Sequence, residues 1–462
     1  MDKRLNCNFL SSFSIISCIQ TLTVYMYILF LTHHASSIEY ASYISLTYIV
    51  DFTVAISLFG FNLLILREHE SYISNNILSI TLISFIITCI VFLFWLLTIH
   101  QQYTLETLLC FLLIVMQYLY QIGYTIQIKF KQNTTALYNA IINFTFTMLG
   151  LYGLTYFNAL SCQNVLIVRI AQLCIFSLIC YQASKKYIPA LNRVSTETIR
   201  SSFKAALPIG GGAILGTIIL FVDKFIVTTL SYEDVATYSI ARLEIPFIGI
   251  FIANLSLVFM PSIKDSFCNK NMNDVIIRIR ELFTYGWYLN VIFFTLLFCN
   301  AEFIITTLYS ESYAASVPLF KILICTYLLK IFPYTNILVA LGLEKIIVPR
   351  LFIEMIIQIV ASFALLNIWG ITGLASCAVL VLAFWSIPYN IYFIKKAINT
   401  SISNFVPFST MIYFFFKCFI PSLLITYYVN EISQPIYGAL ASLCVVLIIN
   451  SKEIIYVYKH TK

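Results

Sequence analysis

Charge is the scarcest property of this chain. Only 10% of its 462 residues are Asp, Glu, Lys or Arg, whereas 60% are apolar. The mean hydropathy of +0.91 lies far above the average of soluble domains. This composition excludes a soluble globular enzyme and predicts an all-α polytopic membrane protein. The net charge of +7 is then explained by orientation in the membrane, so no nucleic-acid partner is implied.

Patterns for metal binding, disulfides and catalysis are also missing. The 13 cysteines include no Cys-x-x-C pair and no histidine at metal-ligand spacing, which argues against a zinc site and a disulfide framework. The two longest polar breaks, at 185–208 and 262–283, are too short for a catalytic domain. We therefore expect no catalytic residue, no metal and no cofactor, and a protein that is not an enzyme.

Apolar runs of about 20 residues, the length that crosses a bilayer, recur along the whole chain. The sequence predicts about fourteen transmembrane helices, at 9–31, 40–66, 74–99, 105–128, 134–157, 161–183, 206–230, 235–260, 281–300, 316–341, 347–367, 370–394, 407–428 and 434–457.

The distribution of basic residues supports an even number of spans. With the N-terminus inside, all but six of the 27 basic residues fall in cytoplasmic segments, and Arg350 is counted among them. The charged residues of the outward loops are all acidic. The sequence therefore predicts a multi-pass protein with both termini in the cytoplasm.

A short repeat predicts two lobes. EYASYISL begins at Glu39 in the second span, and DVATYSIA begins at Asp234 in the eighth. Six spans apart means the same orientation, so the repeats would be parallel. We expect an N-terminal six-helix lobe at 1–184, a cytoplasmic linker at 185–205, a C-terminal six-helix lobe at 206–396 and two additional transmembrane helices at 397–462, with a central cavity between the lobes.

Charges inside the predicted spans are the candidate functional residues, because each costs at least ~2.5 kcal/mol at the bilayer centre on insertion scales. The basic ones are Arg169, Lys224, Arg242, Lys321, Lys330 and Lys417, and the acidic ones are Asp51, Asp223, Glu244 and Glu354. At ~1.5 Å per residue, six of them lie about 8 to 14 Å below the outer surface: Arg169, Asp223, Lys224, Arg242, Glu244 and Lys321.

Two interpretations of these charges are open. They can form buried ion pairs, such as Asp223 with Arg242 or Glu244 with Lys321. Six cations against four anions nevertheless leave two positive charges unmatched, which favours a wet cavity that receives an anionic ligand.

The adjacent Asp223 and Lys224 point about 100° apart on a helix. Asp223 shares its face with Gly212 and Gly216, where a neighbouring helix can approach closely, so we expect Asp223 to pair within the protein. Lys224 would then face the cavity. The reverse assignment is also compatible with the sequence.

Tyrosine is abundant, with 31 copies, and several lie in or near spans. Examples are Tyr43, Tyr48, Tyr118, Tyr120, Tyr124, Tyr238, Tyr327 and Tyr334. An aromatic belt at the membrane interface explains most of them. Deeper copies can line a cavity, where the ring stacks on a sugar and the hydroxyl bonds to it.

Residues 207–265 carry a family resemblance: LPIGGGAILGTIILFVDKFIVTTLSYEDVATYSIARLEIPFIGIFIANLSLVFMPSIKD. This stretch resembles the start of the second lobe in polysaccharide transporters of the multidrug, oligosaccharidyl-lipid and polysaccharide exporter superfamily, and bacterial O-antigen flippases most of all. The matching features are the Asp223-Lys224 pair, Tyr-Ser-x-Ala-Arg ending at Arg242, and Pro261, which closes the eighth span. EYASYISL followed by Phe59-Gly60 matches in the second span, with Ala41 where a glycine is usual.

The resemblance implies a flippase of the bacterial inner membrane. It would move an undecaprenyl-diphosphate-linked oligosaccharide, such as an O-antigen unit of lipopolysaccharide, to the outer leaflet by alternating access. Candidate substrate-binding cations are Arg169, Lys224, Arg242, Lys321 and Lys330. Asp51, Asp223, Glu244 and Glu354 are candidates for coupling a proton or sodium ion, or for ion pairs.

Partners of such a flippase would be a polysaccharide polymerase and chain-length machinery. The absence of an arginine in the first span weakens a role in peptidoglycan synthesis. The alternatives are a cation-coupled multidrug exporter of the same fold, for which Asp51 is the only buried acid in the first lobe, and a membrane enzyme that processes lipid-linked glycans.

Overall fold

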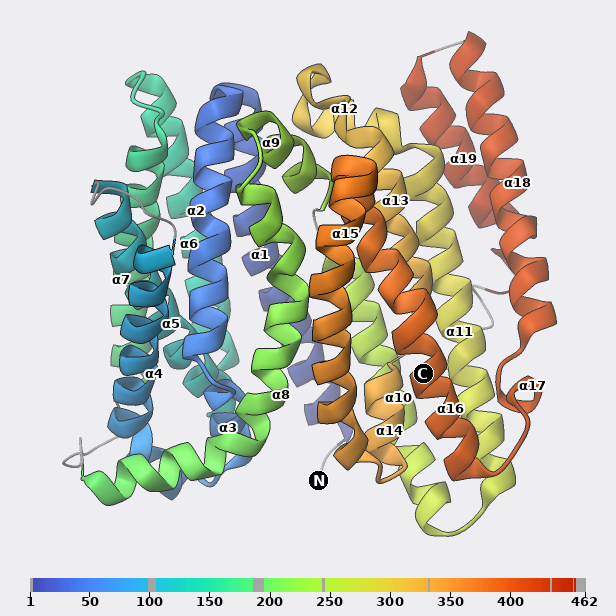
Figure 1. Cartoon of the computed structure of the whole chain (residues 1–462), viewed down its shortest axis with the longest axis horizontal. Coiled ribbons are helices and arrows are strands. Elements are labelled where there is room, and N and C mark those ends of the chain that lie inside the picture. The colour runs from blue at the N-terminus through green and yellow to red at the C-terminus, as the bar shows by residue number, and fades with distance from the viewer. Residues whose placement is uncertain are drawn as a thin grey trace. The chain divides into compact units, whose positions relative to one another are not determined.

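The structure is a computed structural model that describes residues 3–98, 105–130, 132–185, 195–242, 246–330, 333–432, 434–451 and 453. Helices account for nearly all of these residues, and the described part contains no strand, so the all-α prediction is confirmed (Figure 1). The chain divides into two compact units, Met1–Ala236 and Thr237–Lys462.

The described part of unit 1 consists of helices. They are α1 (Lys3–His34), α2 (Ser37–Ser57), α3 (Phe61–Arg67), α4 (Glu70–Thr98), α5 (Leu105–Lys129), α6 (Asn133–Tyr156), α7 (Cys162–Ser184) and α8 (Thr196–Thr228). The next helix, α9 (Tyr232–Ala241), contains the boundary between the units.

Helices α2, α5 and α7 form the centre of unit 1, since α2 contacts both of the others as well as α4 and α8. A bend of 43° separates α2 from α3. Gly60 makes this bend possible, because its φ of 72° lies in the left-handed region that glycine enters without strain. Helix α8 packs on α2, α3 and α4, which places it in unit 1 although the sequence predicted it as the first helix of the second lobe. The predicted lobe boundaries stay a prediction.

Unit 2 contains the remaining helices. They are α10 (Pro246–Cys268), α11 (Met272–Cys299), α12 (Ala301–Tyr309), α13 (Ser316–Leu329), α14 (Tyr334–Ala340), α15 (Ile347–Val381), α16 (Ile387–Ile398), α17 (Ile402–Phe405), α18 (Phe408–Ile432) and α19 (Pro435–Ile449). Pro261 lies inside α10, which continues to Cys268, so it does not end the helix; its place at the end of the eighth span stays a prediction.

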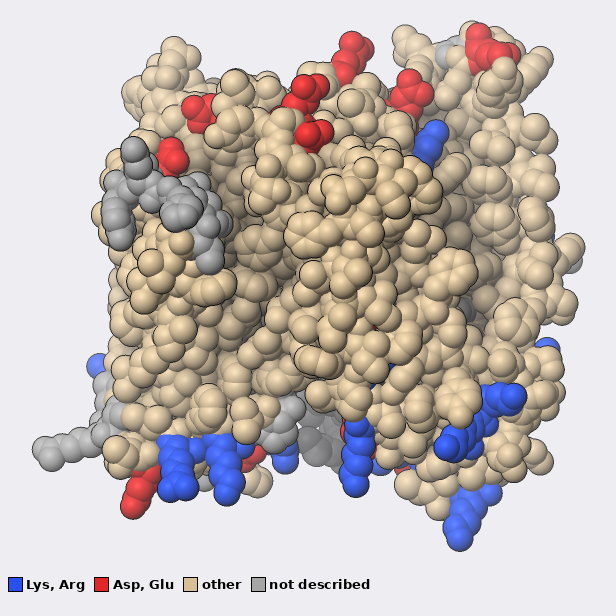
Figure 2. Space-filling view, viewed as in Figure 1, with Lys and Arg blue, Asp and Glu red and all other residues tan. Residues whose placement is uncertain are grey.

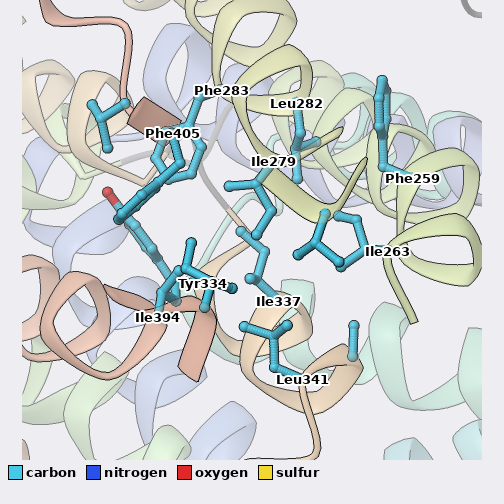
Figure 3. Close-up of a cluster of buried hydrophobic side chains, with 14 of the residues drawn as sticks. Phe259, Ile263, Ile279, Leu282, Phe283, Tyr334, Ile337, Leu341, Ile394 and Phe405 are labelled. Carbon is cyan, nitrogen blue, oxygen red and sulfur yellow. The ribbon is translucent and has the colours of Figure 1, made fainter. Parts of the chain in front are cut away.

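Helix α11 organises the core of unit 2 (Figure 3). Its buried Ile279, Leu282 and Phe283 face side chains from α10, α14, α16 and α17, among them Ile263 and Phe405. Lipid tails are as apolar as leucine, so this core is stabilised by close packing more than by exclusion of water.

Helix α15 is an antiparallel hairpin although its residues run on without a loop. Gly370 has φ 62° and ψ −147°, a conformation that breaks the helix and that only glycine adopts readily. The two arms then pack closely, since a Cβ on Gly373 would lie 2.1 Å from the carbonyl oxygen of Leu365. Ser362 also reaches Cys377 across the hairpin. The predicted spans 347–367 and 370–394 therefore correspond to its two arms, the second of which continues through a π-helical turn into α16.

Nine helices among the described residues are long and apolar enough to cross a membrane, or ten if the bent α2–α3 pair is one span. That number takes the hairpin of α15 together with α16 as a single stretch, Glu344–Ile398. The predicted count of fourteen stays a prediction. Within each unit, Figure 2 shows most Lys and Arg side chains gathered at one end of the helices and Asp and Glu at the other, the asymmetry that the sequence predicted.

The two copies of the predicted repeat share local structure. Ser36 accepts a hydrogen bond from the backbone of Glu39 at the start of α2, and Ser231 accepts one from Asp234 at the start of α9. The tyrosine that follows the acid by four residues is buried in both copies, at Tyr43 and Tyr238. A serine N-cap with an acid at the third helical position satisfies free backbone donors and complements the helix dipole.

Candidate functional site

An arginine of unit 1 with a side chain only 13% exposed contacts polar partners on two other helices. Arg169 of α7 donates to the hydroxyl of Tyr43 on α2 at 3.0 Å and to the side-chain oxygen of Gln117 on α5 at 3.3 Å. Its Nη2 lies 3.9 Å from the carboxylate of Asp51 on α2. Gln117 donates to that same carboxylate at 2.8 Å, so the amide bridges the two charges. We call Arg169, Asp51, Gln117, Tyr43 and the neighbouring Tyr27 the Arg169 cluster.

The helix starts explain why these side chains meet. The carboxylate of Glu39 in the first turn of α2 accepts a hydrogen bond of 2.6 Å from the backbone of Cys162, the first residue of α7. This contact fixes the two N-termini beside each other, and a carboxylate there also complements the dipole of α7. Tyr43 and Arg169 then lie one and two turns further along their helices. The spacing in the local sequence therefore sets the position of both residues along their helix axes.

A second layer of hydrogen bonds continues from the cluster toward α1 and α6. The Tyr27 ring centroid lies 5.9 Å from the Arg169 guanidinium carbon, a cation–π distance. The Tyr27 hydroxyl donates to Gln172, whose amide donates in turn to Asn143 and, at 2.8 Å, to Thr147. Five helices of unit 1 thus contribute to one polar network.

This network borders a cavity of about 400 Å³, which we call the polar cavity. Its lining comprises Gln20, Thr23, Val24, Tyr27, Asn62, Leu66, Gln117, Tyr120, Gln121, Tyr124, Thr125, Ile128, Asn143, Arg169, Gln172 and Leu173. A neighbouring cavity of about 380 Å³ shares Asn62, Gln117 and Gln121 with it and reaches Asp51. Amides and phenols therefore dominate the polar part of the surface, and Arg169 is the basic residue in it.

Two buried atoms of this lining have no hydrogen-bond partner among the described residues. They are the hydroxyl of Tyr124 and the side-chain oxygen of Asn62. A buried polar group without a partner costs roughly 1 to 3 kcal/mol. Such atoms in a cavity wall therefore indicate that water or a ligand supplies the missing hydrogen bonds. The Tyr120 and Tyr124 rings are stacked at 6.2 Å, and Gln20 donates to the Tyr120 hydroxyl. The cavity can thus offer both aromatic faces and fixed hydrogen-bonding groups.

Asp223 and Lys224 have different surroundings on α8. Asp223 is only 1% exposed, and its carboxylate accepts the backbone N–H of Lys224 at 2.9 Å. The Lys224 ammonium lies 4.5 Å from the Phe221 ring centroid and 5.5 Å from that of Tyr48 on α2. Lys224 is half-buried and rests on aromatic faces, a favourable place for a cation.

The close helix approach predicted at Gly212 and Gly216 is wrong. A Cβ at either position would meet no described atom within 4 Å, whereas at Gly210 it would collide with the backbone and ring of Phe59. The sequence shows which positions carry glycine, but the bend at Phe59 determines that Gly210 is the glycine in close contact.

The described candidate residues of unit 2 lie on α13 and α15 or directly after a helix. Arg242 follows α9, and Lys330 caps the end of α13. Lys321 of α13 is half-buried, with its ammonium 5.6 Å from the Phe298 ring centroid on α11. Glu354 is buried on α15. Glu244 lies outside the described residues, and the convergence of the two sets of cations stays a prediction.

Several cations of the predicted spans have carboxylate partners, but Arg350 and Glu453 add one charge of each sign, so the predicted surplus of two positive charges is unchanged. Arg169 has Asp51, and Lys417 of α18 has Glu453, at 2.5 Å. Arg350, predicted in a cytoplasmic loop, is buried on α15 with its Nε 3.7 Å from Glu354. Arg350 and Glu453 lie near the ends of the predicted spans 347–367 and 434–457, and the count of intramembrane charges did not include them.

Sequence reasoning also missed the amides of the polar cavity. It considered charges, although Gln117, Tyr120, Gln121 and Tyr124 follow one another at helical spacing on α5. A polar stripe at i, i+3, i+4 and i+7 inside an apolar helix is the signal that points to this wall.

We expect Asp51→Asn to destabilise unit 1 by about 2 kcal/mol, because it leaves the mostly inaccessible Arg169 without a carboxylate and arginine cannot lose its proton. Arg169→Gln should cost less, since the Asp51 side chain is 42% exposed and Arg169 only 13%. Equilibrium unfolding of the purified chain in mixed micelles measures both. The double variant should be more stable than Asp51→Asn alone, and strict additivity of the two costs would contradict the pairing.

Comparison with known proteins identifies the fold. No protein-family model and no curated protein matches the sequence. Among solved structures, the lipid II flippase MurJ in an inward closed conformation has a TM-score of 0.66 at 14% identity, over 99% of this chain and 100% of that one. An inward-facing multidrug resistance MATE family transporter of the MOP superfamily has a TM-score of 0.57 at 14% identity, over 85% and 96%. A mutant of the Vibrio cholerae MATE transporter VcmN gives 0.54 at 11% identity, over 86% and 98%.

At these identities the likeness concerns the fold and not the substrate. It extends over the full length of the chain in the first case, so the helices of both units take part in it. Together with the apolar helices, it shows that the chain is an integral membrane protein with the fold of MOP-superfamily transporters.

Proposed function

We propose that this protein is a flippase that carries a lipid-linked oligosaccharide diphosphate across the bacterial inner membrane. The proposed substrate is an undecaprenyl-diphosphate-linked unit of O-antigen or a related surface polysaccharide. The observation that carries the proposal is the polar cavity of unit 1, in which amides and tyrosines surround two unpartnered buried atoms. The fold shared with a lipid II flippase supports it.

The lining of the polar cavity suits a sugar better than a hydrophobic drug. Sugar hydroxyls both donate and accept hydrogen bonds, as amide side chains and tyrosine hydroxyls do. Sugar rings also present C–H faces that stack on aromatic rings, and Tyr27, Tyr120 and Tyr124 supply such rings here. The Tyr124 hydroxyl and the Asn62 oxygen would gain the partners they lack.

The diphosphate requires positive charge that the protein does not neutralise itself. Lys224 and Lys321 fit this role best, because both rest on aromatic rings and have no carboxylate within 4 Å among the described residues. Arg169 fits it less well, since Asp51 already balances its charge. We propose Lys224 in unit 1 and Lys321 in unit 2 as phosphate-binding cations, each argued within its own unit, and Arg169 as the residue that orients the wall of the sugar site. A role of Arg242 and Lys330 in binding the substrate stays a prediction.

A cation-coupled multidrug exporter is the second candidate, because solved MATE transporters share the fold. Such a protein would need an available carboxylate, and Asp51 reaches the cavity beside the polar one. The guanidinium of Arg169 at 3.9 Å and the amide of Gln117 already bind that carboxylate, which disfavours a second cation. This contact favours the flippase.

The function is tested with the purified full-length chain in liposomes. A fluorescent undecaprenyl-diphosphate oligosaccharide is placed in both leaflets, and a membrane-impermeant quencher reports which molecules reach the outside. We expect the quenched fraction to rise from about half to nearly all. Protein-dependent uptake of cationic dyes under a sodium or proton gradient, without movement of the glycolipid, would establish the exporter instead.

Variants of the polar cavity link this activity to the proposed site. Tyr124→Phe removes an unpartnered hydroxyl without changing the fold, and Asn62→Leu removes the unpartnered oxygen. We expect each to slow glycolipid translocation about tenfold while thermal stability is unchanged or higher, because a buried unsatisfied group is lost. Tyr118→Phe is the matched control, since Tyr118 is buried on α5 but does not line the cavity. Normal rates of glycolipid translocation in both cavity variants would show that the substrate does not bind in the polar cavity.

A further inference from the structure

A second cavity of unit 1 has the opposite character. It has a volume of about 410 Å³ and lies between α4, α5 and α7. One face of each helix lines it: Ile77 to Thr81 on α4, Met116 to Ile126 on α5 and Cys174 to Lys185 on α7. We call it the apolar groove. It shares no lining residue with the polar cavity.

The groove has a closed floor and an open side. Ile77, Ile122 and Ile126 are buried beneath it, and α5 meets α7 so closely at Gly123 that a Cβ there would lie 2.8 Å from Cys180. Leu178 and Tyr181 on its rim are 57% and 53% exposed. A ligand can therefore enter from the side of unit 1 and rest on an aliphatic surface.

The hydroxyl groups inside the groove are already satisfied by its own helices. Ser177 donates to the carbonyl of Met116 at 3.3 Å, and Thr81 donates to that of Leu78 at 2.9 Å. The middle of the groove thus offers an occupant no free hydrogen-bonding group. Its surface suits a hydrocarbon chain and not a sugar.

Length and charge identify the occupant. From Cys174 to Lys185 the groove follows α7 for about 16 Å, close to the ~15 Å depth of one leaflet. At one end stands the exposed Lys185, which has no carboxylate within 4 Å among the described residues. This is the end where α7 and α5 stop and α4 begins, and Figure 2 shows Lys and Arg gathered there. Basic residues at the ends of grooves between membrane helices attract anionic lipid headgroups.

We propose that the apolar groove binds one acyl chain of an anionic phospholipid from the leaflet on the lysine-rich side, with the phosphate of its headgroup at Lys185. The site is independent of the proposed transport function. It holds a structural lipid against α4, α5 and α7, and the last two of these helices also carry residues of the polar network around Arg169.

Photocrosslinking of the full-length chain in liposomes tests the site. The probe is phosphatidylglycerol with a diazirine near the end of one acyl chain, diluted in phosphatidylcholine, and the equivalent phosphatidylcholine probe is its comparison. We expect the phosphatidylglycerol probe to label the groove faces of α5 and α7, near Met116 and Cys174. Labelling by the two probes to the same extent would overturn the proposal.

Two pairs of variants make the test specific. Leu178→Trp fills the groove and should reduce labelling at least about fivefold, whereas Ile175→Trp, on an exposed face of α7 outside the groove, should not. Leu178→Gln serves where the tryptophan variant is not monodisperse. Lys185→Gln should reduce the preference for phosphatidylglycerol about fivefold, the effect of one basic residue near a membrane surface, and Lys204→Gln should leave it unchanged.

Unchanged labelling in Leu178→Trp, or unchanged headgroup preference in Lys185→Gln, would refute the site. Competition decides between lipids, because a polyprenyl phosphate that displaces phosphatidylglycerol at equal or lower concentration would assign the groove to the carrier lipid and overturn the proposed occupant.

Discussion

Glu354→Gln should destabilise unit 2 by about 3 kcal/mol, more than the loss of its partner would. Arg350 and Glu354 are both less than a tenth exposed and lie 3.7 Å apart on one face of α15. Without the carboxylate, the buried guanidinium keeps Asn390 as a hydrogen-bond acceptor, at 2.9 Å, and it cannot lose its proton. Arg350→Met should cost less, because the remaining carboxyl group can take up a proton.

Unfolding of the purified variants in mixed micelles gives the order of stabilities. The double variant Arg350→Met with Glu354→Gln removes both charges and should be more stable than Glu354→Gln alone. Glu354 would act as a coupling site instead of a structural partner if Glu354→Gln kept full stability but lost transport.

Gly373→Ala should open the hairpin of α15 and cost about 3 kcal/mol, at the upper end for adding a methyl group to a packed site. The new Cβ would lie 2.1 Å from the carbonyl oxygen of Leu365, a backbone atom that cannot rotate away. Ser362 and Cys377, which touch across the arms, would separate. A cysteine crosslink between the arms reports this separation through its rate of formation.

Gly153→Ala on α6 is the matched control for this helical glycine. A Cβ there meets no described atom within 4 Å, so alanine should stabilise the helix by up to about 1 kcal/mol through its higher helix propensity. Equal stability of the two variants would contradict the close packing of the hairpin.

The helices and their order followed from the sequence, because backbone N–H and C=O groups in lipid must be hydrogen-bonded within the protein. An apolar segment of about 20 residues meets this requirement as a helix. The hairpin was partly visible, since spans were predicted on both sides of Gly370, but not its lack of a loop. One glycine with positive φ reverses the chain there, and composition cannot distinguish it from a glycine inside a helix.

The sequence predicted individual residues of the candidate site but not the contacts between them. Arg169, Asp51 and Tyr43 were named as polar residues within spans. Tyr27, the pairing of Arg169 with Asp51 and the amide bridge of Gln117 were not predicted. Arg169, Asp51 and Gln117 belong to three helices, and their contact depends on the rotation of each helix about its axis. The contact between Glu39 and Cys162, which aligns α2 with α7, has no signature in sequence.

The sequence by itself determined that this is a helical membrane protein with one basic and one acidic end, because the cost of placing charge in hydrocarbon acts on each residue separately. The tertiary structure alone decided which buried charges are neutralised, which glycines are packed and which side chains face a cavity. Those properties depend on distances of a few ångströms between helices, and the energy of a charge or a hydrogen bond changes over such distances.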